Sequence, residues 1–270
     1  MRDTAASNWS RRRVLSAAAG GVALGATGAF AGVTPASAHG DIQTYSTVGG
    51  QRTVYEGNGA LTSFGYRPSF HTRCDTWMNF WNTHTPSGFN TPFRVWCYGV
   101  HTDHRVTEAH NNGRGFDLTR IYVTSSTGSL VRRFNGRYDQ WNGTSSAATE
   151  RLRYWATAAS LHYHFKHVLT YLYNSAHHNH IHFDNLVSGT GNSTFATGSQ
   201  AQVQHVQACC RYIWGKTTGI DGIWGPQTNQ HSTEVLRRIG VSSGSLTSSQ
   251  SNWLAFNRGS TRKGYGTQAY

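Results

Sequence analysis

The chain has 270 residues, which is enough for one sizeable hydrophobic core and a small satellite domain. Lys and Arg outnumber Asp and Glu by 24 to 12, so the formal net charge is +12; this favours polyanionic partners without choosing among them. No long apolar run follows residues 1–38, which excludes a membrane-spanning protein once that segment is removed.

Residues 1–38 have the features of an export signal. A twin-arginine region, SRRRVL at 10–15, precedes a Gly- and Ala-rich apolar stretch, and Ala36-Ser37-Ala38 forms an A-x-A cleavage site. The pattern predicts a bacterial twin-arginine signal peptide rather than a membrane anchor. We therefore expect a secreted, extracellular or cell-wall-associated protein that begins at His39. Removing four Arg and one Asp with the signal lowers its formal charge from +12 to +9.

The remaining chain divides by composition into three parts. Residues 39–186 are rich in aromatic side chains and contain every motif that suggests chemistry. Residues 187–200 are mostly small and polar, which predicts a flexible linker. Residues 201–270 begin with a compact helical piece; their last part, 242–270, indicates only one further helical turn around Trp253.

The patterns in residues 39–186 predict an α+β domain with a small antiparallel sheet. Aromatic and β-branched residues indicate strands at 94–100 and 116–123. An apolar stripe at helical spacing indicates a helix from Ala147 to Tyr173, with Ser146 as its N-cap. That helix contains three histidines, which we interpret as packing residues rather than metal ligands: His162, His164 and His167.

Four cysteines remain after the signal: Cys74, Cys97, Cys209 and Cys210. None has C-x-x-C spacing, which argues against a cysteine-based zinc site. An exported protein can form disulfides, and four thiols allow three connectivities. A bridge between Cys74 and Cys97 is the preferred one, since a bond between the adjacent Cys209 and Cys210 would be strained.

The most informative motif is His180-Ile181-His182-Phe183-Asp184. Ile181 and Phe183 are good strand formers, and alternate residues of a strand point to one face. We therefore expect His180, His182 and Asp184 to share a face while Ile181 and Phe183 enter the core.

A second motif places His110 and Asp117 on either side of Asn111-Asn112-Gly113-Arg114-Gly115. These residues favour a chain reversal, so we expect a strand–turn–strand that brings His110 near Asp117. Imidazoles and a carboxylate are ligands of a catalytic Zn²⁺, which keeps a fourth position open. If the two motifs converge, a metal-dependent hydrolase follows. The alternatives are a histidine-rich surface patch and a purely structural metal.

The two motifs together resemble those of the zinc peptidases that include D-Ala-D-Ala carboxypeptidases, and most closely their extensin-like relatives. The similarity covers roughly residues 66–186 and implies a small α+β fold with a central antiparallel sheet, as in lysostaphin-type peptidases and the hedgehog domain. It implies His110, Asp117 and His182 as the Zn²⁺ ligands. His180 would then line the site and assist catalysis.

One position departs from this family. Three residues before the last histidine ligand the family has Asp or Glu as general base, whereas this chain has Asn179. The base would then be His180, Glu108 or Asp184, of which His180 is favoured because a neutral imidazole titrates near pH 7. Asp184 has a second reading, in which it orients an imidazole.

Two arginines are candidates for binding a carboxylate of the substrate. A guanidinium pairs bidentately with such a group, and Arg105 and Arg114 lie close to the first motif. Arg114 is favoured because it lies within the motif itself, although both also fit ordinary surface charges.

The C-terminal part carries a second resemblance. Asp221-Gly222-Ile223-Trp224-Gly225-Pro226, between two expected helices, is similar to the turn of small peptidoglycan-binding domains. This implies an all-α binding domain over residues 201–270. Within it, Asp221, Gly222, Trp224 and Gly225 are the candidate binding residues, with Thr228 available to cap the next helix.

These features predict a secreted zinc metallopeptidase that cleaves stem peptides of peptidoglycan, as carboxypeptidase or endopeptidase. We expect a monomer that contacts peptidoglycan and anionic wall polymers but neither nucleic acid nor, after signal cleavage, membrane. One alternative is a wall-binding protein with a weak or inactive catalytic domain, for which Asn179 is the main support. A secreted metal-dependent nuclease is the other, since the basic charge also suits phosphate chemistry.

Overall fold

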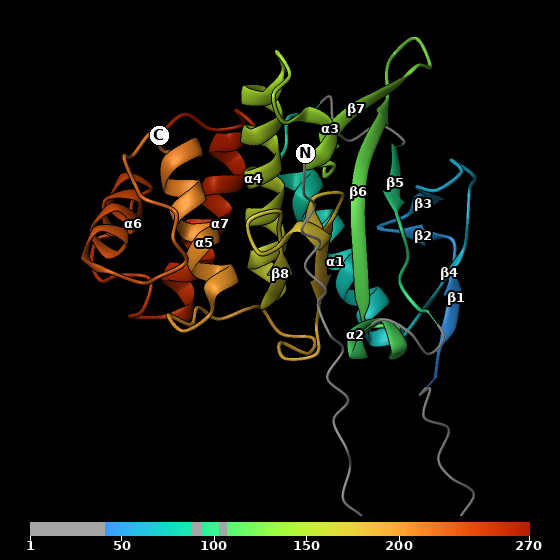
Figure 1. The fold of residues 1–270 in the computed structure, drawn as a ribbon, viewed down its shortest axis with the longest axis horizontal. Coiled ribbons are helices and arrows are strands. Elements are labelled where there is room, and N and C mark those ends of the chain that lie inside the picture. Colours follow the sequence, from blue (N-terminus) through green and yellow to red (C-terminus); the bar gives the residue numbers. More distant parts are fainter. Residues whose placement is uncertain (1–40, 88–92, 103–106) are drawn as a thin grey trace, which may run out of the picture. The chain divides into compact units, whose positions relative to one another are not determined.

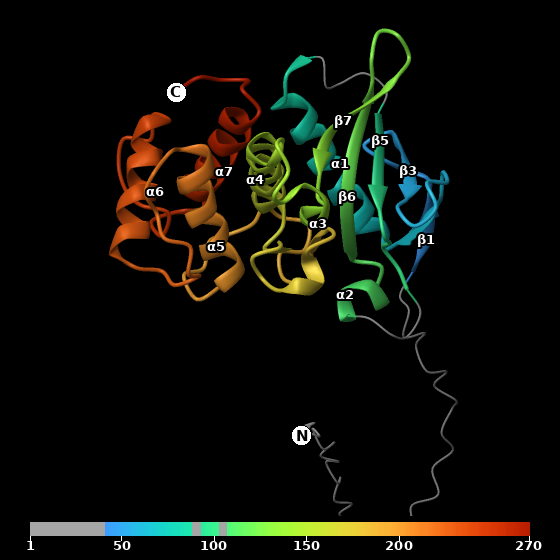
Figure 2. The same ribbon diagram turned by 45° about the horizontal axis from the view of Figure 1, so that its top comes forward.

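The computed structural model describes residues 41–87, 93–102 and 107–270, and residues 39–270 form one compact unit. The expected signal peptide and Arg105 lie outside the described residues. Within them the chain is α+β: the strands all lie before residue 185, and helices α5, α6 and α7 follow them (Figure 1 and Figure 2). None of the described helices is long and apolar enough to cross a membrane.

Most strands belong to one seven-stranded sheet, in the order β2-β3-β5-β6-β9-β8 with β7 paired to β6. The bounds are β2 (Thr47–Val48), β3 (Gln51–Tyr55), β5 (Phe93–Cys97), β6 (Gly115–Thr124), β7 (Leu130–Asn135), β8 (His167–Leu169) and β9 (Ile181–Asp184). A separate two-stranded sheet joins β1 (Gln43–Tyr45) and β4 (Phe64–Tyr66).

The expectation of a purely antiparallel sheet is wrong at one pair, because β3 and β5 run parallel. Parallel neighbours need a long crossover, and the chain supplies one that contains helix α1 (Pro68–Thr83). The sheet is therefore mixed. The expected strands around residues 94–100 and 116–123 correspond to β5 and β6.

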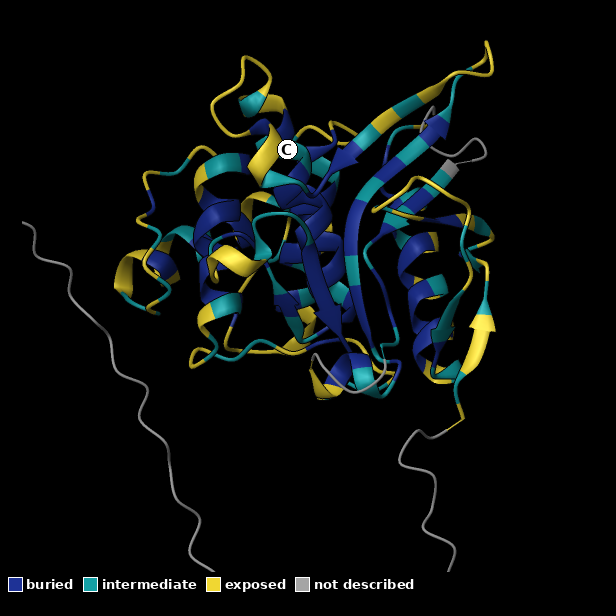
Figure 3. Cartoon of the chain, turned by 45° about the vertical axis from the view of Figure 1, so that its right-hand side comes forward, coloured by how far each residue is buried: buried dark blue, intermediate teal, exposed yellow. Residues whose placement is uncertain are grey.

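The core lies between the sheet and helices α1 and α4 (Ala147–His164). Phe183 of β9 contacts Phe70 and Trp77 of α1, with ring centroids 6.2 and 5.3 Å apart. The Trp77 indole donates to Ser160 Oγ of α4 at 2.9 Å, so α1 contacts both the sheet and α4. Figure 3 shows the buried residues along the central strands and the helices that face them.

The expected helix from residue 147 to 173 is too long. Helix α4 ends at His164, Phe165 is extended, and β8 begins at His167. Phe165 and Val168 are fully buried, so the apolar residues that continue the helical stripe instead pack from the edge of the sheet. Ser146 occupies the N-cap position, but its side chain makes no capping hydrogen bond.

The C-terminal part contains α5 (Gln200–Ala208), a π-helical turn at Cys209–Ile213, α6 (Pro226–Arg238) and α7 (Gln250–Gly264). The single turn expected around Trp253 is in fact the 15-residue helix α7. Helix α7 packs closely on α4, since a Cβ at Gly264 would lie 2.6 Å from Ala156 Cβ. The full length of α7 was not predicted because its polar face contains Ser, Asn and Gly, which are weak helix formers.

The segment expected to be a flexible linker is held against α4. Ser193 is buried, its hydroxyl donates to the carbonyl oxygen of His162, and it accepts from the Trp253 indole at 2.7 Å. Gln202 Nε2 donates to the carbonyl oxygen of Thr194 at 2.9 Å. The regions before and after 187–200 therefore share a core, and their assignment as separate catalytic and binding domains stays a prediction.

The preferred Cys74–Cys97 disulfide is wrong in this structure. All four cysteines are free thiols in the core. Cys74 lies in α1 and Cys97 at the end of β5, each enclosed by apolar side chains, and burial raises the pKa of both thiols. They behave as small apolar packing residues.

Candidate metal centre

Three elements bring the two histidine motifs together. Strands β6 and β9 are antiparallel neighbours, and their register places Asp117 directly opposite His182. His110 comes from the short helix α2 (Glu108–Asn111), immediately before β6. The ligand atoms of His110, Asp117 and His182 all lie within 4.8 Å of one another, so this group could hold a metal ion.

The first motif is a helix followed by a turn and a strand, so the expected strand–turn–strand is wrong. Thr107 caps α2 by accepting from the backbone N–H of His110 at 3.5 Å. Gly113 then turns the chain with φ +62°, and a Cβ there would lie 2.9 Å from the backbone nitrogen of Arg67. The positive φ and the close approach to Arg67 both require glycine. The reversal itself was predicted correctly.

A second glycine makes room for the two imidazoles. A Cβ at Gly115 would lie 3.1 Å from Cε1 of His182 and 3.2 Å from Cε1 of His110. Both distances are tighter than ordinary van der Waals contacts. Any side chain at this position would therefore push the imidazoles out of their present positions.

The three candidate ligand atoms form a small triangle. His110 Nε2 lies 3.2 Å from Asp117 Oδ1 and 3.2 Å from His182 Nδ1, and His182 Nδ1 lies 2.9 Å from Asp117 Oδ1. Ligands about 2.0–2.1 Å from a tetrahedral ion are separated from one another by about 3.3 Å. The triangle therefore needs only a slight expansion to surround such an ion.

The outer nitrogens of both imidazoles are held by the protein. His110 Nδ1 lies 2.6 Å from the carbonyl oxygen of Val100, so it donates there and leaves Nε2 as a lone-pair donor for a metal. His182 Nε2 lies 3.3 Å from Asp184 Oδ2. A carbonyl or carboxylate behind each ligating histidine is the usual arrangement at metal centres.

Asp184 is itself fully engaged. Besides His182, it accepts from the backbone N–H of Leu186 at 3.0 Å and lies 3.4 Å from His167 Nδ1. These contacts favour the interpretation in which Asp184 orients an imidazole over the one in which it is the general base.

The electrostatics of the triangle suit a cation. Burial raises the pKa of the Asp117 carboxyl, but its contacts with the imidazoles of His110 and His182 outweigh this effect and hold the pKa far below its usual range. Burial lowers the pKa of His182, yet hydrogen bonds to Asp117 and Asp184 raise it to about 9. The carboxylates thus hold positive charge where the ligand atoms converge, and a metal ion would supply that charge in place of the proton.

His180 lies at the edge of the triangle rather than within it. Its Nε2 is 3.4 Å from Asp117 Oδ1, and its Nδ1 is 2.6 Å from Asn179 Oδ1. Because the Asn179 oxygen can only accept, Nδ1 carries the proton and Nε2 presents a lone pair towards the centre. Burial lowers the pKa of His180, which keeps the imidazole neutral.

Two other predicted residues have different surroundings. Glu108 is exposed in the first turn of α2. Arg114 donates from Nε to Asn185 Oδ1 at 2.8 Å and from its terminal nitrogen to the Asn185 carbonyl oxygen. Arg114 therefore joins the start of β6 to the end of β9, which leaves fewer donors for a substrate.

Sequence reasoning missed several neighbours of the centre. No sequence pattern identifies the main-chain carbonyl group of Val100 as the partner of His110. His177 and Tyr98 approach His180, with ring centroids 5.2 and 6.3 Å away. The run of histidines just before His180 was the available signal for His177. Tyr98 follows β5, and only the pairing of β5 with β6 brings it close.

The candidate peptidoglycan-binding residues build a turn that is fastened to α5. Gln207 donates to Asp221 Oδ1 at 2.7 Å and accepts from the backbone N–H of Gly222 at 2.9 Å. Gly222 has φ +75°. Trp224 packs edge-on against Phe195 with centroids 4.9 Å apart, which leaves Ile223, 68% exposed, as the outward-facing side chain.

Gly225, rather than Thr228, is the N-cap of α6. Thr228 lies inside the helix, where its hydroxyl accepts from Gln207 at 3.2 Å. The turn motif is therefore a structural unit that connects α5 to α6.

Comparison of the chain with protein-family models, curated proteins and solved structures finds no match. The arrangement of the site itself is therefore the ground for a functional assignment.

Proposed function

We propose that this protein is a secreted zinc-dependent peptidase that hydrolyses amide bonds in the stem peptides of peptidoglycan, as a carboxypeptidase or an endopeptidase. The observation that carries the proposal is the convergence of His110, Asp117 and His182 on one point. Their outer contacts leave the inward-facing atoms free to bind a cation.

The donor set favours zinc among biological metals. Ca²⁺ and Mg²⁺ prefer oxygen ligands, and Mg²⁺ binds few protein groups besides carboxylates. Two imidazole nitrogens with one carboxylate oxygen match catalytic Zn²⁺ sites, which use three protein ligands and keep a fourth position open. When bound, zinc would supply Lewis acidity to polarise the scissile carbonyl group.

The chain's own residues have distinct tasks in this reaction. Asp184 orients His182, and the Val100 carbonyl orients His110, so the ligand geometry is set before the metal arrives. His180, whose Nε2 lies 3.4 Å from Asp117 Oδ1, would accept the proton of the attacking water and pass it to the leaving amine. Asn179 replaces the usual acidic base but holds His180 in the tautomer that this task requires.

A cavity of about 410 Å³ borders Asp184, behind His182, and its lining includes none of the three candidate ligands. Lys166, His167 and Tyr173 line it. Peptidoglycan as the substrate is supported by the two family resemblances and by the formal charge of +9 after signal removal.

A second candidate function is a wall-binding protein whose catalytic domain is inactive. The observation that favours it is Asn179, which cannot accept a proton at the position where the related peptidases have an acid. A metal-dependent nuclease is the third candidate, supported only by the basic charge and the histidine cluster.

The test is digestion of purified peptidoglycan by residues 39–270, with and without a chelator. The wild type should release new amino groups or free D-Ala, and both the chelator and His182→Ala should reduce this at least 100-fold. A matched control is His231→Ala, because His231 contacts Thr218 in the C-terminal part, far along the chain from either motif. Binding to walls without release would favour the wall-binding protein, and nicking of plasmid DNA would favour the nuclease.

A further inference from the structure

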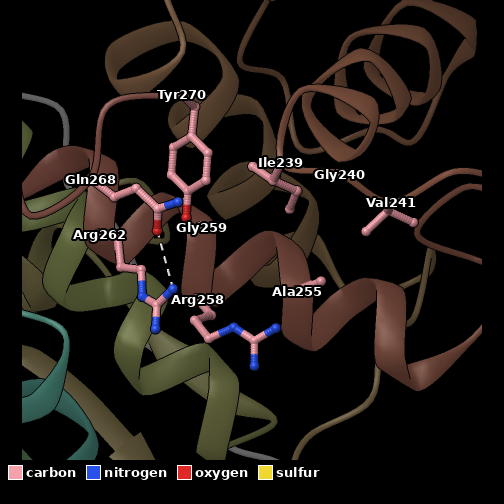
Figure 4. A pocket seen from close by; sticks show the side chains of 9 residues that line it. All are labelled: Ile239, Gly240, Val241, Ala255, Arg258, Gly259, Arg262, Gln268 and Tyr270. Carbon is pink, nitrogen blue, oxygen red and sulfur yellow. Dashed lines mark hydrogen bonds between the residues drawn. The ribbon is translucent and has the colours of Figure 1, made fainter.

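A second pocket is built by elements that take no part in the metal centre. It has a volume of about 250 Å³ and lies between the end of α6, helix α7 and the last residues of the chain (Figure 4). We call it the basic pocket. The lining residues that matter for its chemistry are Ile239, Val241, Arg258, Arg262, Gln268 and Tyr270.

The pocket is lined by two arginines and by no Asp or Glu side chain. Arg258 and Arg262 are one helical turn apart on α7, so they lie on the same side of it. Residues 235–270 contain five Arg or Lys and no Asp or Glu. Across residues 41–87, 93–102 and 107–270, the ion pairs involve other arginines and lysines. Arg262 donates to the neutral amide oxygen of Gln268, at 3.1 Å.

This positive field reaches a neighbouring histidine. His84, at the end of α1, has its pKa lowered to about 4, chiefly by burial and then by Arg262 and Arg258. A nearby carboxylate would have offset those cations. The effect on His84 agrees with the absence of acidic residues from the lining.

The walls of the pocket are held in place by the protein. Arg238 donates twice to the main-chain carbonyl oxygen of Tyr270, at 3.1 and 2.8 Å. The Tyr270 ring also contacts Trp214, with centroids 5.4 Å apart. On the opposite side, a Cβ at Gly259 would lie 3.0 Å from Ile239 Cγ2, so α7 and the end of α6 are closely packed.

We propose that the basic pocket binds a small organic acid: a phosphate or carboxylate group carried on a body of about one sugar ring. Guanidinium groups bind both kinds of oxyanion through paired N–H donors. The aliphatic side chains of Ile239 and Val241 and the ring of Tyr270 offer contacts that a bare inorganic ion cannot use. A volume of about 250 Å³ suits one ring better than a polymer segment.

The test is calorimetric titration of residues 39–270 at low salt with four probes: glucose 1-phosphate, glucuronate, glucose and inorganic phosphate. At least one of the two sugar acids should bind, and binding should weaken as salt is added. Preference for one of them identifies the natural source as a phosphate ester or a carboxylate. No binding by either acid, equal binding of glucose, or equally tight binding of inorganic phosphate would overturn the proposal.

Substitutions of its lining residues test whether the sugar acid binds in the basic pocket. The double variant Arg258→Gln, Arg262→Gln should bind the sugar acid at least tenfold more weakly than the wild type. A control pair that removes the same charge, Arg52→Gln with Arg237→Gln, should change it less than twofold, since neither residue lines the pocket. If the first pair fails to fold, Tyr270→Ala should weaken the sugar acid several-fold while inorganic phosphate is unaffected. Equal losses in both pairs would show a general charge effect and contradict the assignment.

The result is independent of the metal centre. Binding should be the same with and without a chelator, so loss of the zinc-peptidase proposal would leave this one standing, and the reverse also holds.

Discussion

Two groups of histidines in this protein have opposite surroundings. In the metal centre, both ring nitrogens of His110 and of His182 face a partner, and carboxylates are among those partners. His162, at the junction of α4 with the C-terminal helices, and His164, which faces α1, are buried with no hydrogen-bond partner for their ring nitrogens among the described residues. The comparison indicates that carboxylates around an imidazole, rather than histidine content, distinguish the candidate metal centre from the core.

The two groups should respond differently to acid, and this is the largest effect that we expect. His205 of α5 also belongs to the second group, because its ring centroid lies 4.1 Å from that of His162, and burial lowers its pKa to about 3. An unfolded histidine takes up a proton near pH 6.5 whereas the folded one stays neutral, so stability is lost as the pH falls below that value. Between pH 7 and pH 5 this histidine alone should cost about 2 kcal/mol of unfolding free energy.

The measurement is urea unfolding of chelated wild type and His205→Gln at both pH values. Glutamine does not titrate but can still pair with Asn257, the present partner of His205 at 2.8 Å. Between pH 7 and pH 5, the free energy of unfolding of the variant should fall by about 2 kcal/mol less than that of the wild type. Parallel curves for the two proteins would mean that His205 does not stay neutral in the fold.

The next effect concerns the carboxylate behind the metal centre. Asp184→Asn keeps the shape of the side chain but weakens its hold on His182, so zinc affinity should fall about 10- to 100-fold. Competition with a chromophoric chelator measures this. Asp139→Asn is the matched control, since Asp139 pairs with Arg137 rather than with a candidate ligand, and it should leave the affinity unchanged. An unaltered affinity in Asp184→Asn would contradict the orienting role.

The smallest effect tests the space between the two imidazoles. In Gly115→Ala the new methyl group would press on His110 and His182, so zinc affinity should fall several-fold. Gly128→Ala is a matched glycine control away from the centre, where a Cβ meets nothing within 4 Å, although its positive φ adds backbone strain. Zinc titrations measure the affinity of both variants. Equal zinc affinity in Gly115→Ala and the wild type would contradict the close contact of Gly115 with the two imidazoles.

The sequence predicted which residues converge in the candidate metal centre better than it predicted the elements that carry them. Alternation around Ile181 and Phe183 was enough to place His182, because both apolar residues are buried. The helical start of the first motif was missed, since four residues of α2 carry no periodicity. Its cap, Thr107, was the available signal.

Other features depend on contacts between distant parts of the chain. Helix α4 ends at His164 because the following residues join the sheet edge beside β9, which helical spacing cannot reveal. Likewise, the polar composition of 187–200 suggested a free linker, yet its Ser193 is bonded to α4 and α7. Packing partners decided both outcomes.

The most direct test of the account is the zinc content of residues 39–270 after zinc loading and dialysis. The wild type and His205→Gln should each retain one zinc per chain, because the second histidine group takes no part in binding, whereas His182→Ala should retain almost none. A wild type without zinc, or His182→Ala with one zinc per chain, would contradict the metal centre described here.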